Sequence, residues 1–322
     1  MSASSPNKSG WFAPVPPTVA IEIAAGRVTV AELSGGSGGP VVSAFASESL
    51  PAGAVVPALT GSNIADATIV ADALRSALQR AGLGSPRRAA LVVPDSVARV
   101  SLLNFEQMPS RASDLDQLIR WQLRKATPFP IDEAQVSHFR ASGDGKAVML
   151  AGVVARRDVI GQYEAVTNLL GIHAGVVDLA SFNIMNAVIS AGSAPSDDWL
   201  LVCLASDATT IAIMRGDQLM FYRHRTSVDE EPLSALVHQT AMYHEDRLGG
   251  TKFARVWLAG AALAGGNAPL ARREITDRLN VPAEAVDVRP AAGLPSQVQP
   301  LPDIMDALAA PVGVLLRERR AA

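Results

Sequence analysis

The 322-residue chain contains a single cysteine, Cys203, so an internal disulfide framework is excluded. One cysteine in a chain of this length fits a reducing compartment. Cys203 lies inside an apolar segment, which favours a packed thiol over a reactive one. The sequence also has no run of about 18 apolar residues, and we predict no transmembrane helix. Residues 1–17 lack the apolar core of a signal peptide and are predicted to be a flexible tail.

The chain has little net charge and few aromatic side chains. Its formal net charge is −3 at pH 7, and aromatic residues make up 5% of it. Charge therefore favours neither nucleic acid nor an anionic lipid surface as a partner. The five histidines show no zinc-binding spacing, so we predict no metal site and expect ordinary surface or interfacial histidines. A Walker A motif is absent, residues 35–39 (GGSGG) fit G-x-S-x-G only as part of a Gly-rich turn, and no catalytic residue is predicted.

Hydrophobic residues make up 48% of the chain, which is enough for a large core shared between two domains. Residues 18–33 (TVAIEIAAGRVTVAEL) show period-2 alternation on both sides of a small-residue turn, and this pattern predicts a β-hairpin. Residues 200–221 repeat the pattern around a turn at residues 205–208. Two strand–turn–strand units, each followed by helical segments, predict a duplicated α/β fold.

Apolar residues at helical spacing predict the main helices. The expected ranges are 62–81, 114–125, 158–170, 181–191, 232–248, 270–279 and 311–320. We predict that Ser113 caps the second of these helices, that Asp178 caps the fourth, and that Pro311 is the first residue of the last. Asp178 is alternatively a catalytic carboxylate at a strand end, but no paired acid or base accompanies it in the sequence. Residues 286–288 are predicted to form the last strand.

Four stretches, taken in order, resemble the PilM family of type IV pilus assembly proteins, which are actin-like relatives of the division protein FtsA. The stretches are TVAIEIAAGRVTVAEL, ALVVPDSVARVSLLNFEQMP with DLDQLIRWQLRKATPFPIDEAQVSHF, VVARRDVIGQYEAVTNLLGIHAGVVDLASFNIMNAV, and APVGVLLRER. The most specific feature is a helix that leads into Pro128, Phe129 and Pro130. The resemblance runs from about residue 18 to residue 319.

The resemblance implies a duplicated actin-like (ribonuclease H-like) two-domain fold with an inserted subdomain of the FtsA/PilM type. The first actin-like subdomain then comprises residues 18–84 and 172–197, and the inserted subdomain comprises residues 85–171. The second actin-like domain comprises residues 198–322 and contains a helical insertion at about 224–252. In this family, a groove beside the inserted subdomain binds the cytoplasmic N-terminal peptide of PilN, a bitopic inner-membrane protein.

The resemblance also implies a nucleotide cleft, and its contact residues are altered in this chain. Family members that bind ATP usually carry an Asp-x-Gly-Ser-type turn in the first hairpin, where this chain reads EIAAGR at residues 22–27. An alanine Cβ hinders the close backbone approach that phosphate needs. The second turn lacks a carboxylate at residues 203–205, and the expected Gly-Gly pairs read Ala259-Gly260 and Ser227-Val228. The candidate nucleotide-contacting residues are Glu22, Ala25, Gly26, Arg27, Asp207, Thr209 and Gly260.

These departures argue against ATP hydrolysis, and no cofactor is expected. ATP with Mg²⁺ stays open as an alternative, because the guanidinium of Arg27 is able to hold a phosphate. The interpretation that we favour for Arg27 is a solvated side chain in a hairpin turn. The basic end of the terminal helix, residues 317–320, is likewise expected to be solvated rather than to contact the inner leaflet.

The leading functional hypothesis is a non-enzymatic cytoplasmic scaffold, held at the inner membrane through a PilN-like partner. Other platform or motor components and a homo-oligomeric ring are expected around it. The basic end of the helix at 114–125, with Arg120, Arg124 and Lys125, is a candidate partner-binding surface, although the helix's apolar face is expected to be core. One alternative is a nucleotide-gated ATPase of the same machine. Another is a type II secretion platform component, but such a protein is expected to continue into a transmembrane helix.

Overall fold

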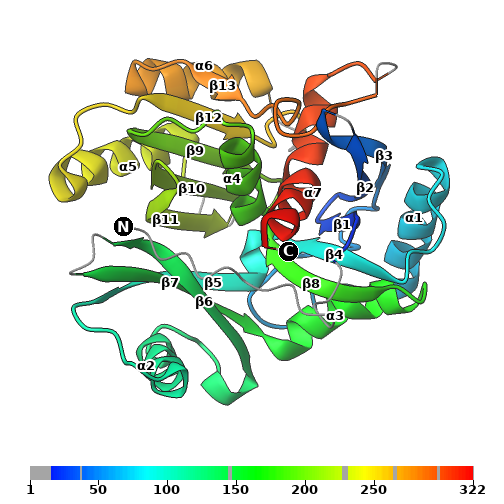
Figure 1. Cartoon of the computed structure of the whole chain (residues 1–322), viewed down its shortest axis with the longest axis horizontal. Helices are drawn as coiled ribbons and strands as arrows, with labels where there is room; N and C mark the ends of the chain where they lie inside the picture. Colours follow the sequence, from blue (N-terminus) through cyan, green and yellow to red (C-terminus); the bar gives the residue numbers. More distant parts are fainter. Residues whose placement is uncertain are drawn as a thin grey trace.

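The computed structural model describes residues 16–36, 38–143, 147–226, 231–263, 267–295 and 298–321. Within these ranges the chain forms three β-sheets, two with five strands and one with three (Figure 1). Most of the predicted tail, residues 1–15, lies outside the described residues, as do Ser227 and Val228.

The first sheet has the strand order β3-β2-β1-β4-β8. Its strands are β1 (Val19–Ala24), β2 (Arg27–Gly36), β3 (Gly39–Ser49), β4 (Arg88–Val93) and β8 (His173–Leu179). The first three strands form an antiparallel meander, whereas β4 and β8 run parallel to β1. The predicted hairpin is therefore confirmed as β1–β2, and Ile21 and Ile23 are fully buried in the core.

The second sheet repeats this arrangement with the order β11-β10-β9-β12-β13. Its strands are β9 (Asp198–Leu204), β10 (Ala208–Arg215), β11 (Gln218–Thr226), β12 (Arg255–Ala259) and β13 (Ala283–Ala285). Again three antiparallel strands come first, and two parallel strands follow. The matching order confirms the duplicated α/β fold. The last strand, however, is β13 and not residues 286–288, which follow it in the chain.

The third sheet has the order β5-β7-β6 and is antiparallel. Its strands are β5 (Ala98–Phe105), β6 (Ala134–Gly143) and β7 (Val148–Arg156), and helix α2 (Ala112–Arg124) covers one face. The inserted subdomain was predicted to begin at residue 85, but β4 belongs to the first sheet, between β1 and β8. Its sequence, RAALVV, is the continuous apolar run of a strand buried on both faces. The other domain bounds stay predictions.

The remaining helices join the strands or cover the sheets. They are α1 (Ala67–Arg80), α3 (Arg157–Asn168), α4 (Ala180–Ser190), α5 (Leu233–Leu248), α6 (Ala268–Leu279) and α7 (Pro302–Ala321), with short 3₁₀ turns η1 (Asp95–Val97) and η2 (Ile131–Glu133). Helix α5 lies in the predicted insertion at 224–252, although β11 still occupies residues 224–226.

Four predicted helix starts were wrong by two residues or more. Helix α6 begins at Ala268 rather than residue 270, after the cap Asn267. Helix α1 begins at Ala67 rather than residue 62, because the Asp66 carboxylate accepts a hydrogen bond from the Thr68 N–H. Helix α2 starts at Ala112, before Ser113, and no side chain caps it. Helix α7 begins at Pro302, where a missing N–H needs no partner, and Pro311 lies inside the helix.

Helices α4 and α7 pack against each other between the two five-stranded sheets (Figure 1). Helix α7 also contacts β1, β2 and β4, so the last helix of the chain packs on the first sheet. Gly313 of α7 lies directly on the backbone of α4, where a Cβ would overlap the carbonyl oxygen of Asn183. These two helices therefore join the two halves of the molecule. We call the part with the first and third sheets the first half, and the part with the second sheet the second half.

Candidate functional site

A cavity of about 430 Å³ lies between the β1–β2 turn of the first half and the β9–β10 turn of the second. Six of the seven predicted nucleotide-site residues line it: Glu22, Ala25, Gly26, Arg27, Asp207 and Gly260. Thr209 does not, and its neighbour Thr210 lines the cavity instead. Successive strand residues point to opposite faces, so an assignment one position off selects the wrong side chain.

Arg27 is not the solvated side chain that we favoured from the sequence. Its guanidinium donates to the Glu22 carboxylate at 2.9 Å, and the Arg27 side chain is only 21% exposed. Burial raises the pKa of Glu22, while Arg27 opposes the shift. The guanidinium proposed for a phosphate thus already has an anionic partner.

The N-terminus of α4 faces this cleft and is capped by Asp95 of η1. One oxygen of Asp95 accepts from the Ser181 N–H at 3.1 Å and from the Ser181 hydroxyl at 2.9 Å. A helix N-terminus is a favourable place for an anion, and here a protein carboxylate occupies it. The predicted cap, Asp178, was wrong because the polypeptide brings Asp95 to this end of α4 from 86 residues earlier.

The loop after β12 is held by a third carboxylate. Asp306 of α7 accepts from the Ala262 N–H at 2.9 Å, and burial raises the pKa of Asp306. Gly260 has φ +78°, and a Cβ there would overlap the carbonyl oxygen of Leu204. The packing of this loop on β9 therefore accounts for the glycine.

A hydrogen-bonded chain crosses the cleft between the two halves. From the first half, the Ser96 hydroxyl donates to Asp207 at 2.7 Å and lies 3.2 Å from Nε2 of His224. From the second half, the Thr210 hydroxyl donates to Asp95 at 2.7 Å and lies 2.9 Å from Nδ1 of His224. Ser96 and Thr210 are buried.

The sequence-based site missed Asp95, Ser96, Thr210, His224 and Asp306. A signal existed for the first two, because the polar pair in Pro94-Asp95-Ser96 directly follows the buried strand β4. Ligands of open α/β sheets bind at the carboxyl ends of such strands. His224 and Asp306 carry no comparable local signal.

No group of three His, Cys, Asp or Glu side chains in the described part of the chain is arranged to hold a metal ion. Cys203 is buried at the edge of the cleft, and burial raises the pKa of its thiol well above the usual value, as expected for a packed thiol. His244 is not a surface histidine, because it is buried and its Nε2 lies 2.8 Å from the Asp198 carboxylate.

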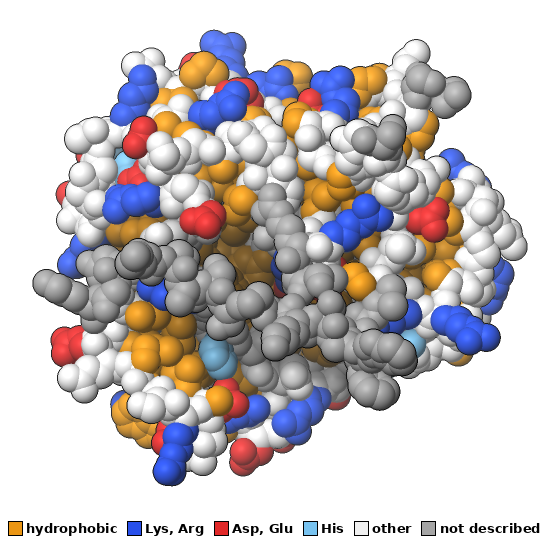
Figure 2. All heavy atoms as spheres, in the orientation of Figure 1, with side chains coloured by type: hydrophobic (Ala, Val, Ile, Leu, Met, Phe, Trp, Pro, Cys, Tyr) orange, Lys and Arg blue, Asp and Glu red, His pale blue; other side chains and the backbone are white. Residues whose placement is uncertain are grey.

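A second cavity, of about 540 Å³, forms a groove on the other side of α4. We call it the α4 groove; its walls come from β6, β7, β8, α4, the β10–β11 hairpin and the end of α7. Figure 2 shows hydrophobic side chains in a hollow between the second and third sheets on this face. The apolar lining includes Phe139, Phe182, Met185, Ile189 and Leu219.

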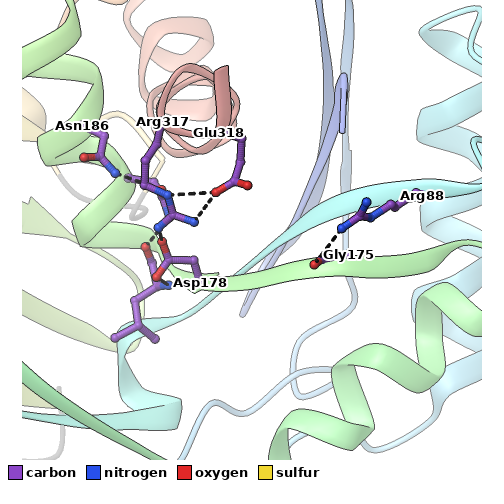
Figure 3. Close-up of polar contacts among 8 residues, drawn as sticks. Arg88, Gly175, Asp178, Asn186, Arg317 and Glu318 are labelled. Carbon is purple, nitrogen blue, oxygen red and sulfur yellow. Dashed lines mark hydrogen bonds and ion pairs between the residues drawn. The ribbon is translucent and has the colours of Figure 1, made fainter. Parts of the chain in front are cut away.

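Polar groups gather where α7 reaches the α4 groove. Arg317 of α7 forms ion pairs with Asp178 at the end of β8 and with Glu318 (Figure 3). Burial raises the pKa of Asp178, and Arg317 opposes the shift. Arg319 donates to the carbonyl oxygens of Leu33 and Ser34, so Arg317 and Arg319 are bonded to the first half and not solvated as predicted.

Arg120, Arg124 and Lys125 do not line the α4 groove. Leu150 and Val154 of β7 pack with Ile119 and Leu123 of α2, whereas Val153 and Ala155 of β7 line the groove. Alternate residues of a strand face opposite sides, so α2 and the groove lie on opposite faces of the third sheet.

On the exposed side of α2, Lys125 lies over the ring of Trp121 at 5.7 Å. Trp121 is 61% exposed, and the sequence did not identify it as a candidate surface residue. Among the residues that the structure describes, no helix is long and apolar enough to cross a membrane.

Comparison with known proteins agrees with this architecture. The family model described as type IV pilus assembly protein PilM matches residues 20–245. A solved PilM-PilN type IV pilus biogenesis complex matches with a TM-score of 0.79 and 17% identity, over 95% of this chain and 99% of that chain. At this identity the solved structure establishes the fold alone.

More distant structures also match. The cytoplasmic domain of EpsL, an inner-membrane component of the type II secretion system of Vibrio cholerae, has a TM-score of 0.48 and 9% identity, over 94% of each chain. A Bacteroides thetaiotaomicron protein with an actin-like ATPase fold has a TM-score of 0.47 and 9% identity, over 85% of this chain and 91% of that chain. No curated protein matches the sequence. Because the family model spans well over half of the 322 residues, the chain belongs to the type IV pilus assembly protein PilM family and has an actin-like fold.

Proposed function

We propose that the chain is a non-enzymatic scaffold of the type IV pilus inner-membrane platform, and that its α4 groove binds the cytoplasmic N-terminal peptide of a PilN-like bitopic protein. The observation that carries this proposal is the groove itself, which is mostly apolar and lined by both halves of the molecule. The partner would place the chain at the inner membrane. Binding of other platform or motor components and assembly into a ring belong to the same proposal.

The groove has the chemistry of an extended-peptide site. Phe139 and Phe182 stack edge to face with ring centroids 5.2 Å apart, and apolar peptide side chains would pack on them. Asp178, Asn186 and Arg317 supply polar groups at one end. Among the residues that the structure describes, β6 is an edge strand of the third sheet, and a peptide can add to such an edge as a further strand.

Phe139 provides a test, because its side chain is 41% exposed in the groove and its removal spares most of the core. We expect Phe139→Ala to weaken binding of a labelled peptide with the partner's cytoplasmic N-terminus by about 30-fold, or about 2 kcal/mol. Fluorescence anisotropy measures this change. The matched control is Trp121→Ala, which removes an exposed aromatic ring on the opposite face of the sheet and is expected to leave affinity within about twofold.

A stronger loss for Trp121→Ala than for Phe139→Ala would place the peptide on α2, with Arg120, Arg124 and Lys125. Wild-type protein that does not bind the peptide at all would contradict the proposal. Both variants are compared at equal folded fractions, checked by circular dichroism.

The main alternative is a nucleotide-gated ATPase that uses the cleft. Against it, protein carboxylates already occupy three positions suited to phosphate: Glu22 on Arg27, Asp95 on the α4 N-terminus, and Asp306 on the loop after β12. The acidic side chains of the cleft outnumber its two basic ones, Arg27 and His224, which disfavours a polyanion; the acidic side chains are Glu22, Asp95, Asp207 and Asp306.

We therefore expect isothermal titration with MgATP to give no saturable heat up to millimolar nucleotide, which corresponds to binding weaker than about −4 kcal/mol. Micromolar binding would favour the ATPase alternative. Phosphate release above buffer, abolished by Glu22→Ala, would establish it.

A further inference from the structure

The four hydrogen bonds that cross the cleft determine which side chain supplies each hydrogen. An ionised carboxylate only accepts hydrogen bonds, and each hydroxyl has one hydrogen to donate. Ser96 donates its hydrogen to Asp207, and Thr210 donates its hydrogen to Asp95. Neither hydroxyl has a hydrogen left for His224, so both ring nitrogens of His224 must be donors for all four bonds to form. Only the doubly protonated, cationic imidazole satisfies this arrangement.

The charged groups around His224 come from several elements. Asp95 of η1 and Asp207 of the β9–β10 turn lie one hydroxyl away on either side of the ring. Cys203 of β9 and Tyr222 of β11 are neutral neighbours, and their burial raises both pKa values well above the usual range. Arg99, Arg223 and Arg225 line the adjoining cavity on the outer side of His224. Asp95 and Asp207 belong to the hydrogen-bonded network around the ring, so these two carboxylates balance its positive charge within the cleft.

The hydrogen-bonded network of the cleft also extends to the α4 groove. Asp95 binds the first turn of α4 through Ser181, and the Ser181 hydroxyl lies 3.0 Å from the Tyr222 hydroxyl. The ring of Phe182, the next residue, lies between Tyr222 at 5.5 Å and Phe139 at 5.2 Å. Helix α4 therefore has its N-terminus in the cleft and its side chains Phe182 and Met185 in the groove.

The residues that line the α4 groove come from both halves of the molecule. Phe139 and Asp178 come from the first half, whereas Met214, Asp217 and Leu219 come from the β10–β11 hairpin. Any opening between the halves would move the hairpin away from β6 and α4 and would widen the groove. A bond across the cleft would oppose such an opening.

We propose that His224 is a proton-dependent clamp: the cationic ring joins the two halves across the cleft and keeps the α4 groove closed around its peptide. The clamp itself stands on the cleft geometry, and its effect on peptide affinity rests on the proposed function. A neutral ring has only one N–H group and would lose one of its two hydrogen bonds to the hydroxyls. Because closure needs both ring N–H groups of His224, a lower pH favours it.

The first test does not use the peptide. In ¹⁵N-histidine NMR of the full chain, we expect two protonated ring nitrogens on His224 at about pH 6 and a single one at about pH 8, within the range where histidines titrate. Hydrogen exchange at residues 180–182 and 205–210, corrected for intrinsic rates, is expected to rise over the same interval. His224→Gln should exchange rapidly at both pH values. His238→Gln, at an exposed histidine of α5, is the matched control and should behave as wild type.

The second test uses a labelled peptide with the cytoplasmic N-terminus of the PilN-like partner. Wild type and His238→Gln are expected to bind at least about fivefold more weakly at pH 8 than at pH 6. His224→Gln should show the weaker affinity at both values. Because the peptide is the same throughout, its own titration cancels in the comparison.

Each outcome decides one proposal. A neutral His224 ring at pH 6, or pH-dependent exchange that persists in His224→Gln, overturns the clamp. Peptide binding whose pH dependence is the same in wild type and His224→Gln overturns its coupling to the groove. A clamp that titrates as expected in a protein that never binds the peptide supports the clamp and contradicts the proposed function.

Discussion

Gly313→Ala is expected to lower the free energy of unfolding by about 3 kcal/mol, the upper end of the cost of adding a methyl group to a packed core. A Cβ at this position would overlap the Asn183 carbonyl oxygen, and it would lie 3.2 Å from the amide nitrogen of Ala187. Both atoms belong to the backbone of α4, so no side chain can rotate out of the way. Urea unfolding followed by circular dichroism measures the change.

Because α4 reaches both the cleft and the groove, Gly313→Ala should also weaken peptide binding in molecules that stay folded. Gly161→Ala is the matched control, since this helical glycine of α3 has open space at its Cβ. It is expected to stabilise the protein by about 0.5–1 kcal/mol, because alanine favours a helix interior. Equal stability of the two variants would show that α4 and α7 are not tightly packed at Gly313.

Arg317→Leu is expected to destabilise the protein by about 2 kcal/mol at pH 8. Removing one partner of a buried ion pair costs roughly 3–5 kcal/mol, and we reduce this value because the Arg317 side chain is 36% exposed to screening water. The loss leaves the Asp178 carboxylate without its cation. Urea unfolding at several pH values measures the effect.

The pH dependence of Arg317→Leu has a definite sign. Burial already raises the pKa of Asp178 above its unfolded value, and removing Arg317 removes the contribution that opposes this shift. The folded state then binds a proton more readily than the unfolded state, so the deficit shrinks as pH falls toward 5. Adding Asp178→Asn should restore part of the lost stability at pH 8.

Arg289→Leu serves as the control for this pair, because Arg289 and Asp287 form an ion pair at the surface. Exposed pairs contribute little, so this variant should show neither a measurable loss nor a pH effect. A deficit for Arg317→Leu that is equally large at pH 5 and pH 8 would show that packing, and not the unpaired carboxylate, causes the loss.

Local patterns predicted much of the fold. Period-2 alternation identified the hairpins β1–β2 and β9–β10, and helical spacing identified α3 and α5 within one or two residues. These signals are reliable because strands and helices bury one face at a fixed period. The turns of the two hairpins and the loop after β12 then identified six of the residues that line the cleft.

Errors arose where a residue's partner is distant in the chain. Asp178 was predicted as a helix cap, yet it pairs with Arg317, 139 residues later, while Asp95 takes the capping role at α4. Thr209 was chosen for the cleft, although strand orientation selects Thr210. Strand β4 was assigned to the insertion, although pairing with β1 and β8 places it in the first sheet.

The amino-acid pattern alone was sufficient for the duplicated sheets, for the altered phosphate turns and for membership of an actin-like family, because each depends on neighbours in the chain. The places of Asp95 and Asp306 in the cleft, the proton count at His224 and the groove along α4 were not readable from it. They depend largely on contacts between residues far apart in the chain, such as Ser181 with Asp95, 86 residues apart, and Ser96 with Asp207, 111 residues apart. Only the packing of α4 and α7 between the two sheets brings these groups within hydrogen-bonding distance.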